Sequence, residues 1–411
     1  MLSRDLYDSL PRQVSTLLLD AQNKTVSDIA RRIRKMNELS ATSEYQLNRL
    51  AEIDQFDMDF RDALGTAAGL VNETIDKMYE DAATRAYTYD KRLFEAKGIP
   101  MSDYSENKWL QQLTTAMADQ TKDEFKNITQ TKAIGFKTSK GKFLKYKNYF
   151  IRQLDTTEFL VSSGAMSYDW AIKKVVREMV SSGLRTVTYS NRSDSIEVAT
   201  RRAIMTGLGN LDEQISIRNI VDLGVKHVQV SWHSTARTGE GINNHAAWQG
   251  GVYALNGFDL TTMTRVKTDN DPDYKDFVET TGYGEVQGLH GANCRHSFSG
   301  FDVKSQVPNY TPEELKDKAE KEATEQEFKF SDGTVSNFTP YGATQQMRKM
   351  EVAMRKQRAL AKGYRSGGNE DAYISAKAKY HSQLHEYNKF AKAMGLQPEM
   401  QRVYMDNLRR I

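Results

Sequence analysis

The sequence predicts a mostly α-helical protein with a central α+β domain and long helical N-terminal and C-terminal regions. Both ends of the chain contain long stretches rich in Ala, Leu, Glu, Lys and Arg, in which apolar residues recur at helical spacing. The 411 residues include only seven prolines, the residue that interrupts helices most strongly. The middle of the chain instead alternates helical and β-patterned segments, which is typical of a compact α+β domain.

Length and composition divide the chain into four predicted regions. A chain of 411 residues is too long to fold around one compact core. At about 150 residues per domain, we expect two or three units. We expect a helical N-terminal region at 1–130, a lysine-rich connector at 131–154, a central α+β domain at 155–301 and a helical C-terminal region at 302–411.

The N-terminal region is expected to contain three helices, at 26–53, 58–96 and 106–130. Gly98 followed by Pro100 is a typical end signal for the second of them. Narrow apolar faces suit the packing of these helices on each other or on a partner. Apolar residues at helical spacing support the first helix, namely Ile29, Ile33, Met36 and Leu39.

The segment 132–147 interrupts this helical pattern with six lysines and no acidic residue. One interpretation is a contact with the phosphate backbone of nucleic acid, in which aromatic side chains stack on exposed bases. The other is a solvated hairpin or loop that joins two domains, the more usual setting of a charge run. The lysines are Lys132, Lys137, Lys140, Lys142, Lys145 and Lys147, and the aromatic residues are Phe136, Phe143 and Tyr146.

The central domain is expected to run in the order helix, strand, helix, strand. Ser167 opens a helix through 180 that Gly183 ends, and 185–189 alternates like a strand. After the second helix, 227–232 alternates apolar and polar residues, as a half-buried strand does. This order favours a compact α+β arrangement.

The second of these helices has its own start and end signals. Asp194 and Glu197 have the spacing of a capping box, which predicts a helix start at this point. The helix continues to Gly224 and passes a weak point at Gly207 and Gly209, because glycine is a poor helix former.

The C-terminal region is predicted to begin with a helix at Thr311, since the following proline suits the first helical position. A hairpin or extended arm is expected at 328–341, around a turn at Asp332 and Gly333. Two last helices, split by a glycine pair, are expected at 345–362 and 370–394.

Composition excludes several classes of protein. The 57 basic and 54 acidic residues give a net charge of +3, which argues against a general nucleic-acid coat. The single Cys294 allows no intramolecular disulfide and fits a reducing compartment. Residues 1–22 lack the apolar core of a signal peptide, and no run approaches the ~18 apolar residues that cross a bilayer. We therefore expect no membrane association.

Five of the seven histidines and the only cysteine lie between residues 227 and 296. Glycines at 282, 284, 288 and 291 indicate a tight, irregular backbone that cannot hold itself by burial alone. One interpretation is a structural Zn²⁺ site, because imidazole and thiolate are ligands that zinc prefers. The other is a loop held by histidine hydrogen bonds, with the cysteine as a small buried residue. The candidate ligands are His233, His245, His290, Cys294 and His296.

Two catalytic interpretations are alternatives to these structural ones. A nucleophilic Cys294 would need His233 or His245 as its base and an asparagine, Asn243 or Asn293, to orient it. A phosphodiesterase would need two histidines and an arginine, either Arg237 or Arg295, on the phosphate. No recognised nucleophile motif surrounds the cysteine and no glycine-rich phosphate loop is present, so we expect no enzymatic activity and no catalytic residue.

The same segment resembles the phage minor capsid protein 2 family, which is related in kind to the Mu-type minor head proteins. The matching runs are 197–207, 233–237, 245–250, 282–284 and 288–298. Thr238 departs from the family at a usual proline, His290 at a common cysteine and Ala292 at a tryptophan. The exchange at His290 keeps a possible metal ligand and therefore favours the zinc interpretation.

The resemblance implies a minor head protein of a tailed bacteriophage, present in several copies inside the virion after assembly in the host cytoplasm. It implies contacts with the portal protein and with major capsid or scaffold proteins. Contact with packaged DNA through the lysine-rich segment would be a secondary role, because the net charge is nearly neutral. The function would then be head assembly or genome delivery. The alternative is a metal-dependent nuclease or transferase effector carried in the head, which the helical C-terminal region does not favour.

Overall fold

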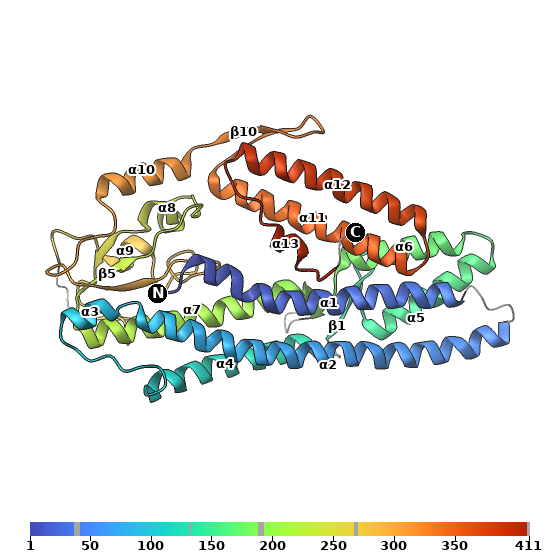
Figure 1. Ribbon diagram of the computed structural model, residues 1–411, viewed down its shortest axis with the longest axis horizontal. Helices are drawn as coiled ribbons and strands as arrows, with labels where there is room; N and C mark the ends of the chain where they lie inside the picture. Colours follow the sequence, from blue (N-terminus) through green and yellow to red (C-terminus); the bar gives the residue numbers. More distant parts are fainter. Residues whose placement is uncertain (37–41, 131–132, 188–192, 267–269, 409–411) are drawn as a thin grey trace. The chain divides into compact units, whose positions relative to one another are not determined.

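The computed structural model describes residues 1–36, 42–130, 133–187, 193–266 and 270–408 (Figure 1). As predicted, the chain is mostly helical with small antiparallel sheets. It forms two compact units, each built from three separated stretches. Unit 1 comprises Met1–Leu10, Ile75–Thr121 and Ile204–Gln346, and unit 2 comprises Pro11–Thr74, Lys122–Ala203 and Met347–Ile411. The four predicted regions are consecutive segments of the sequence, whereas the units combine separated stretches. The division into these regions therefore stays a prediction.

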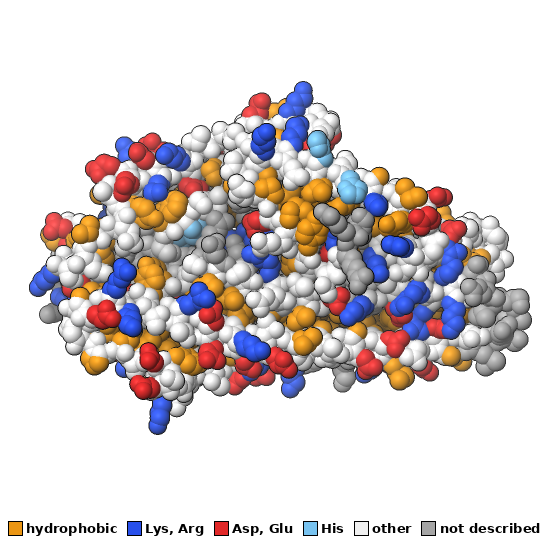
Figure 2. Space-filling model, viewed as in Figure 1, with side chains coloured by type: hydrophobic (Ala, Val, Ile, Leu, Met, Phe, Trp, Pro, Cys, Tyr) orange, Lys and Arg blue, Asp and Glu red, His pale blue; other side chains and the backbone are white. Residues whose placement is uncertain are grey.

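The surface is polar and of mixed charge. Figure 2 shows acidic and basic side chains interspersed over the face that it presents. In the described part of the chain, no helix combines the length and the apolar composition that a membrane crossing requires.

The N-terminal region forms helices whose bounds differ from the prediction. They are α1 (Arg4–Met36), α2 (Thr42–Thr88), α3 (Lys91–Ala96) and α4 (Lys108–Thr129). The predicted start of the first helix at 26 was wrong, as was the predicted break between 53 and 58. Buried Phe56 continues the apolar face between Ile53 and Phe60, so the acidic residues there do not interrupt α2. Leu39 lies outside the described residues.

Unit 2 contains a four-stranded antiparallel sheet in the order β2-β1-β3-β4. Its strands are β1 (Ile134–Lys137), β2 (Phe143–Lys145), β3 (Arg185–Val187) and β4 (Ser193–Ser195), with helices α5 (Tyr146–Ser162) and α6 (Tyr168–Ser182) between β2 and β3. The lysine-rich segment therefore contains a hairpin, and both of its strands lie within unit 2. Ser167 accepts a hydrogen bond from the Trp170 amide at 3.2 Å, and Gly183 ends α6.

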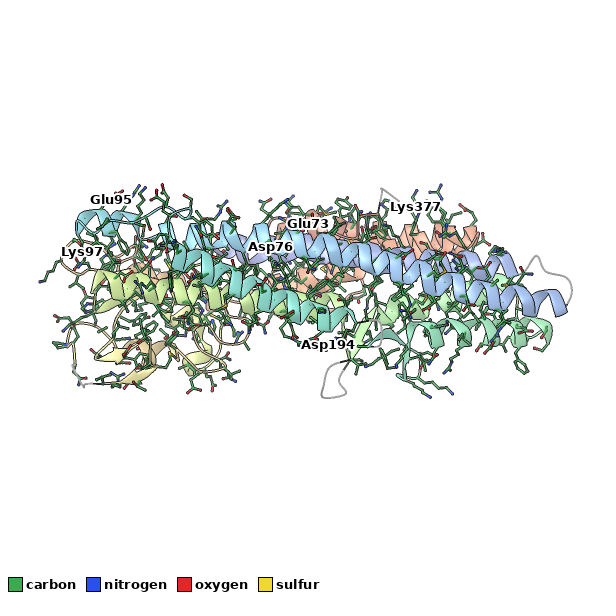
Figure 3. The ribbon with its side chains drawn as sticks, turned by 90° about the horizontal axis from the view of Figure 1, so that it is seen from below. Glu73, Asp76, Glu95, Lys97, Asp194 and Lys377 are labelled. Carbon is green, nitrogen blue, oxygen red and sulfur yellow. The ribbon has the colours of Figure 1, made fainter. Side chains whose placement is uncertain are left out.

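Helix α7 (Ile196–Leu223) begins differently from the prediction. Asp194 lies on β4 (Figure 3), where it pairs with Thr186 in the sheet and its carboxylate binds Arg202 at 3.0 Å. The hydroxyl of Ser195 instead accepts the Val198 amide at 3.3 Å. The predicted capping box was wrong because strand pairing places Asp194 in the sheet.

Gly207 is not a weak point of α7, which continues through it. A Cβ atom at this position would lie 2.0 Å from the Tyr79 hydroxyl oxygen and 2.4 Å from Thr121 Oγ1. The two hydroxyls are themselves hydrogen-bonded at 2.5 Å and buried. Glycine therefore permits close packing of α2 and α4 on α7 within unit 1.

Unit 1 has its core around a three-stranded antiparallel sheet in the order β6-β5-β9. These strands are β6 (Val252–Ala254), β5 (His227–Val230) and β9 (Phe298–Phe301). The short elements of this part of the chain are η1 (Gly241–Asn243), α8 (His245–Trp248), α9 (Phe277–Thr281) and the strand pair β7 (Phe258–Asp259) and β8 (Thr264–Arg265). Figure 1 labels α8 and α9 near β5. Val228, Val230, Trp248, Phe277 and Phe298 belong to the buried cluster that joins them.

The C-terminal elements follow the predicted order. Helix α10 (Pro312–Ala323) begins with a complete capping box between Thr311 and Glu314. The predicted hairpin is β10 (Gln326–Lys329) and β11 (Val335–Phe338). Helices α11 (Pro340–Ser366) and α12 (Glu370–Ala393) are separated by the glycine pair, and α13 (Met400–Tyr404) follows.

Unit 2 buries an ion pair near its C-terminal residues. Arg358 of α11 donates to both carboxylate oxygens of Asp406, at 2.7 and 3.0 Å, and both side chains are at most 2% exposed. The backbone oxygen of Asp406 accepts from Asn23 of α1 at 3.0 Å. The pair therefore ties the last described residues to two helices of the same unit.

Candidate metal centre

The register of the central sheet brings the histidine and cysteine loops together. Val230, the last residue of β5, pairs with Phe298, the first residue of β9. Because the two strands are antiparallel, the loop that leaves β5 and the loop that enters β9 meet at the same end of the sheet. The Ser231 amide donates to the Ser297 backbone oxygen at 2.8 Å, which continues the pairing into these loops.

Glycine residues allow the loop before β9 to fold tightly on itself, as predicted. A Cβ atom on Gly288 would lie 2.0 Å from the backbone oxygen of Gly282. A Cβ atom on Gly291 would lie 2.4 Å from the backbone oxygen of Val286. Both positions therefore require glycine for close backbone approach.

Three of the five candidate ligands converge. His245, Cys294 and His296 each offer one ligand atom, and these atoms lie within 4.8 Å of one another. His245 begins α8, whereas the other two belong to the loop that enters β9. Cys294 Sγ lies 3.6 Å from His296 Nδ1. This group could hold a metal ion.

Both histidines of the group are oriented by carbonyl oxygens. His296 Nε2 lies 3.0 Å from the side-chain oxygen of Gln249, and His245 Nε2 lies 2.9 Å from the backbone oxygen of Gln287. Carbonyl oxygens only accept, so each Nε2 carries the proton and donates. Each Nδ1 is then unprotonated, and on His296 this atom lies 3.6 Å from the Cys294 sulfur. Metal-bound histidines have this arrangement, with the second nitrogen donating to a carbonyl group.

The protonation states also suit a metal. Burial lowers the pKa of His245 to about 4, so this imidazole is neutral at neutral pH and able to act as a ligand. Burial raises the pKa of the Cys294 thiol, outweighing the backbone hydrogen bonds and the Arg237 charge that lower it. The thiol therefore keeps its proton unless a cation displaces it, which is the usual coupling of metal binding to proton release.

The other two candidate ligands lie beside the group rather than in it. His233 stacks on His296, with ring centroids 4.1 Å apart. His290 packs edge-on against Phe298, with centroids 5.4 Å apart, and its Nε2 has no hydrogen-bond partner among the described residues. The two glutamines that orient the ligands were not predicted. Gln249 lies four residues after His245, a spacing that could have suggested it.

The geometry does not favour the cysteine-nucleophile interpretation. The imidazole within hydrogen-bond distance of Cys294 Sγ is His296, although a ligand atom of His245 also lies within 4.8 Å of the sulfur. Asn243 accepts a hydrogen bond from Arg237 at 2.9 Å, and the same guanidinium donates to the Ala292 backbone oxygen at 2.8 Å. A buried thiol of raised pKa is also a poor nucleophile.

Fewer side chains of the lysine-rich hairpin are available to contact a nucleic acid than the sequence suggested. Phe136 and Tyr146 are buried, so neither can stack on an exposed base. Lys147 lies 3.5 Å from Asp54 and 3.7 Å from Asp57, which offset its charge. Lys132 lies outside the described residues.

Comparison with known proteins gives one match. The sequence profile of the family described as Phage minor capsid protein 2 matches residues 2–392. No curated protein sequence and no solved structure shows significant similarity to the chain.

Proposed function

Because the chain belongs to the phage minor capsid protein 2 family, we propose that it acts inside the head, next to the portal. Family membership makes it a structural component of the virion that contacts other virion proteins. The finer assignment is to head assembly or genome delivery, with the portal protein and the major capsid or scaffold proteins as partners. The observation that carries this proposal is the extent of the family match. It includes both the helical regions and the central domain, so the whole matched chain belongs to one family of head proteins.

The same match bears on the effector alternative. Only residue 1 and residues 393–411 of this sequence lie beyond it, too few for a separate catalytic domain within the sequence. The buried thiol and the internally paired arginine beside it also favour a structural role for the central loops.

The location can be tested on purified particles. We expect the protein in mature virions at fewer copies than the major shell protein. We also expect it to resist protease in intact heads, to become sensitive in opened heads and to cross-link to the portal. Digestion in intact heads would contradict an internal position, and absence from mature particles would indicate an assembly factor that leaves earlier.

We further propose that His245, Cys294 and His296 bind one structural Zn²⁺. When bound, the ion would supply a tetrahedral clip between α8 and the loop that enters β9. The oriented imidazoles, the thiol and the neutral state of His245 support the proposal. A water or a further side chain would complete the coordination. The alternative is a loop held by the thiol–imidazole and imidazole–carbonyl hydrogen bonds alone.

Elemental analysis distinguishes the two. Protein purified without added metal should carry about one zinc per chain, and the Cys294→Ser, His296→Ala variant should lose it. His290→Ala is the matched control and should keep the ion, because that side chain lies outside the converging group. Metal-free wild-type protein whose Tm is unchanged by chelator would leave the hydrogen-bonded loop as the correct description.

A further inference from the structure

Unit 2 contains a cavity of about 650 Å³ between the β1–β2 hairpin and helix α6. Its size lies within the range of about 300–1,000 Å³ that is typical of ligand sites. Hydroxyl-bearing residues and Gly141 of the hairpin turn line it together with charged residues. The cations of the lining are Lys137, Lys173, Lys174, Arg177 and Arg185.

The charge of this cavity is strongly positive although the chain is nearly neutral. Glu178 is the one acidic residue in the lining. Its carboxylate already accepts from the Ser139 amide at 2.8 Å and from Gln153 Nε2 at 3.2 Å. Lys137 and Lys173 form no ion pair with any described residue. Their charges are therefore available to an anion.

One cation is held in place by the sheet. The Arg185 guanidinium donates to Ser193 Oγ at 3.2 Å and to the Ser182 backbone oxygen at 3.3 Å. An arginine fixed in this way loses little conformational entropy when it binds a phosphate. The cavity therefore combines one preorganised guanidinium with three lysines.

An aromatic surface lies among these charges. Trp170 lines the cavity and is 46% exposed, unusual for a side chain of this size. Lys174 Nζ lies 5.2 Å from the centroid of its ring. Basic side chains interleaved with an exposed aromatic ring are the elements that bind unpaired nucleotides, since phosphates pair with the cations and bases stack on the ring.

We propose that this cavity binds the phosphodiester backbone of single-stranded nucleic acid, with a base stacked on Trp170. The binding surface is then α6 with the inner side of the hairpin. Of the hairpin lysines that the structure describes, only Lys137 lines the cavity. The proposal does not depend on the position of the protein in the head or on zinc.

The test is the binding of a fluorescent 12-nucleotide oligo(dT) to the full chain, measured by anisotropy between 50 and 200 mM salt. Four phosphate contacts would weaken binding by about 50-fold over this range, since each contributes about 0.7 to the slope of log K against log salt. Lys137→Gln with Lys173→Gln should lower the slope by about 1.4. Trp170→Leu should weaken binding on the order of 10-fold.

The matched control is Lys140→Gln with Lys142→Gln, which removes two charges from the same hairpin outside the cavity. It should leave the slope nearly unchanged, and circular dichroism should show that every variant is folded. Equal effects of both lysine pairs would overturn the cavity as the site. Duplex binding as tight as oligo(dT) binding, or an unaffected Trp170→Leu variant, would overturn single-strand recognition. No binding at 50 mM salt would overturn the proposal altogether.

Discussion

Replacing Gly207 by alanine is expected to destabilise the protein, although alanine normally stabilises the interior of a helix. The added Cβ would lie 2.0 Å from the Tyr79 hydroxyl oxygen and 2.4 Å from Thr121 Oγ1. Non-bonded atoms do not approach so closely, so Tyr79 must move. That side chain is fully buried, and its hydroxyl is bonded to Thr121.

The size of the effect follows from three contributions to the free energy of unfolding. Alanine in place of glycine contributes about 1 kcal/mol in favour of the helix. Separating the two buried hydroxyls costs about 1–3 kcal/mol, because each loses its partner. Displacing the tyrosine ring in a packed interior costs about 1–3 kcal/mol more. The expected net loss is therefore about 3 kcal/mol.

Urea unfolding followed by circular dichroism measures this loss. Gly209→Ala is the matched control, because a Cβ there meets nothing within 4 Å, and it should gain up to about 1 kcal/mol. Adding Tyr79→Phe to Gly207→Ala should recover part of the loss, since the nearest atom is then removed. If Gly207→Ala and Gly209→Ala were equally stabilising, the packing argument for Gly207 would be refuted.

Three further outcomes are expected. Asp406→Asn should cost about 3–5 kcal/mol in urea unfolding because it leaves Arg358 buried without its counter-charge; a loss below 1 kcal/mol would show that water reaches the pair. Thr311→Ala should cost about 1 kcal/mol and speed amide exchange in the first turn of α10, whereas Thr311→Ser should not. In chelator-treated protein, the pKa of His245 is lowered to about 4. As the pH falls, the unfolded chain therefore takes up a proton at a higher pH than the folded protein does. Stability from this group is complete above pH 6.5 and falls by roughly 3 kcal/mol towards pH 4; His245→Gln should flatten this profile, and an unchanged profile would contradict it.

Elements with strong local signals could be predicted from the sequence. Ser167 and Gly183 bound α6, Thr311 starts α10, and the glycine pair separates α11 from α12. Each of these signals acts within one turn of chain, through a hydrogen bond or a positive φ angle. The start of α7 could not be predicted in the same way, because pairing of β3 with β4 determines what Asp194 does.

The sequence identified the segment that contains the candidate site, but it could not identify which residues of the segment come together. Composition identified the segment with the histidines and the cysteine, yet the register of β5 and β9 determines which of them meet. His290 adds no ligand to the converging group, since its ring packs on Phe298. The basic cavity was missed for the same reason, because Lys137, α6 and Arg185 come together only through the sheet.

The two units are built from stretches that alternate along the sequence, and this affects when each unit can fold during synthesis. Unit 1 requires residues from both Met1–Leu10 and Ile204–Gln346, and unit 2 requires Met347–Ile411. Neither unit can therefore be completed on the ribosome until about five-sixths of the chain has been made. Any single cut between residues 11 and 346 also divides unit 1. Expressing the protein as two autonomous halves from one cut should fail, and circular permutation should not help, because it preserves the alternation of the stretches.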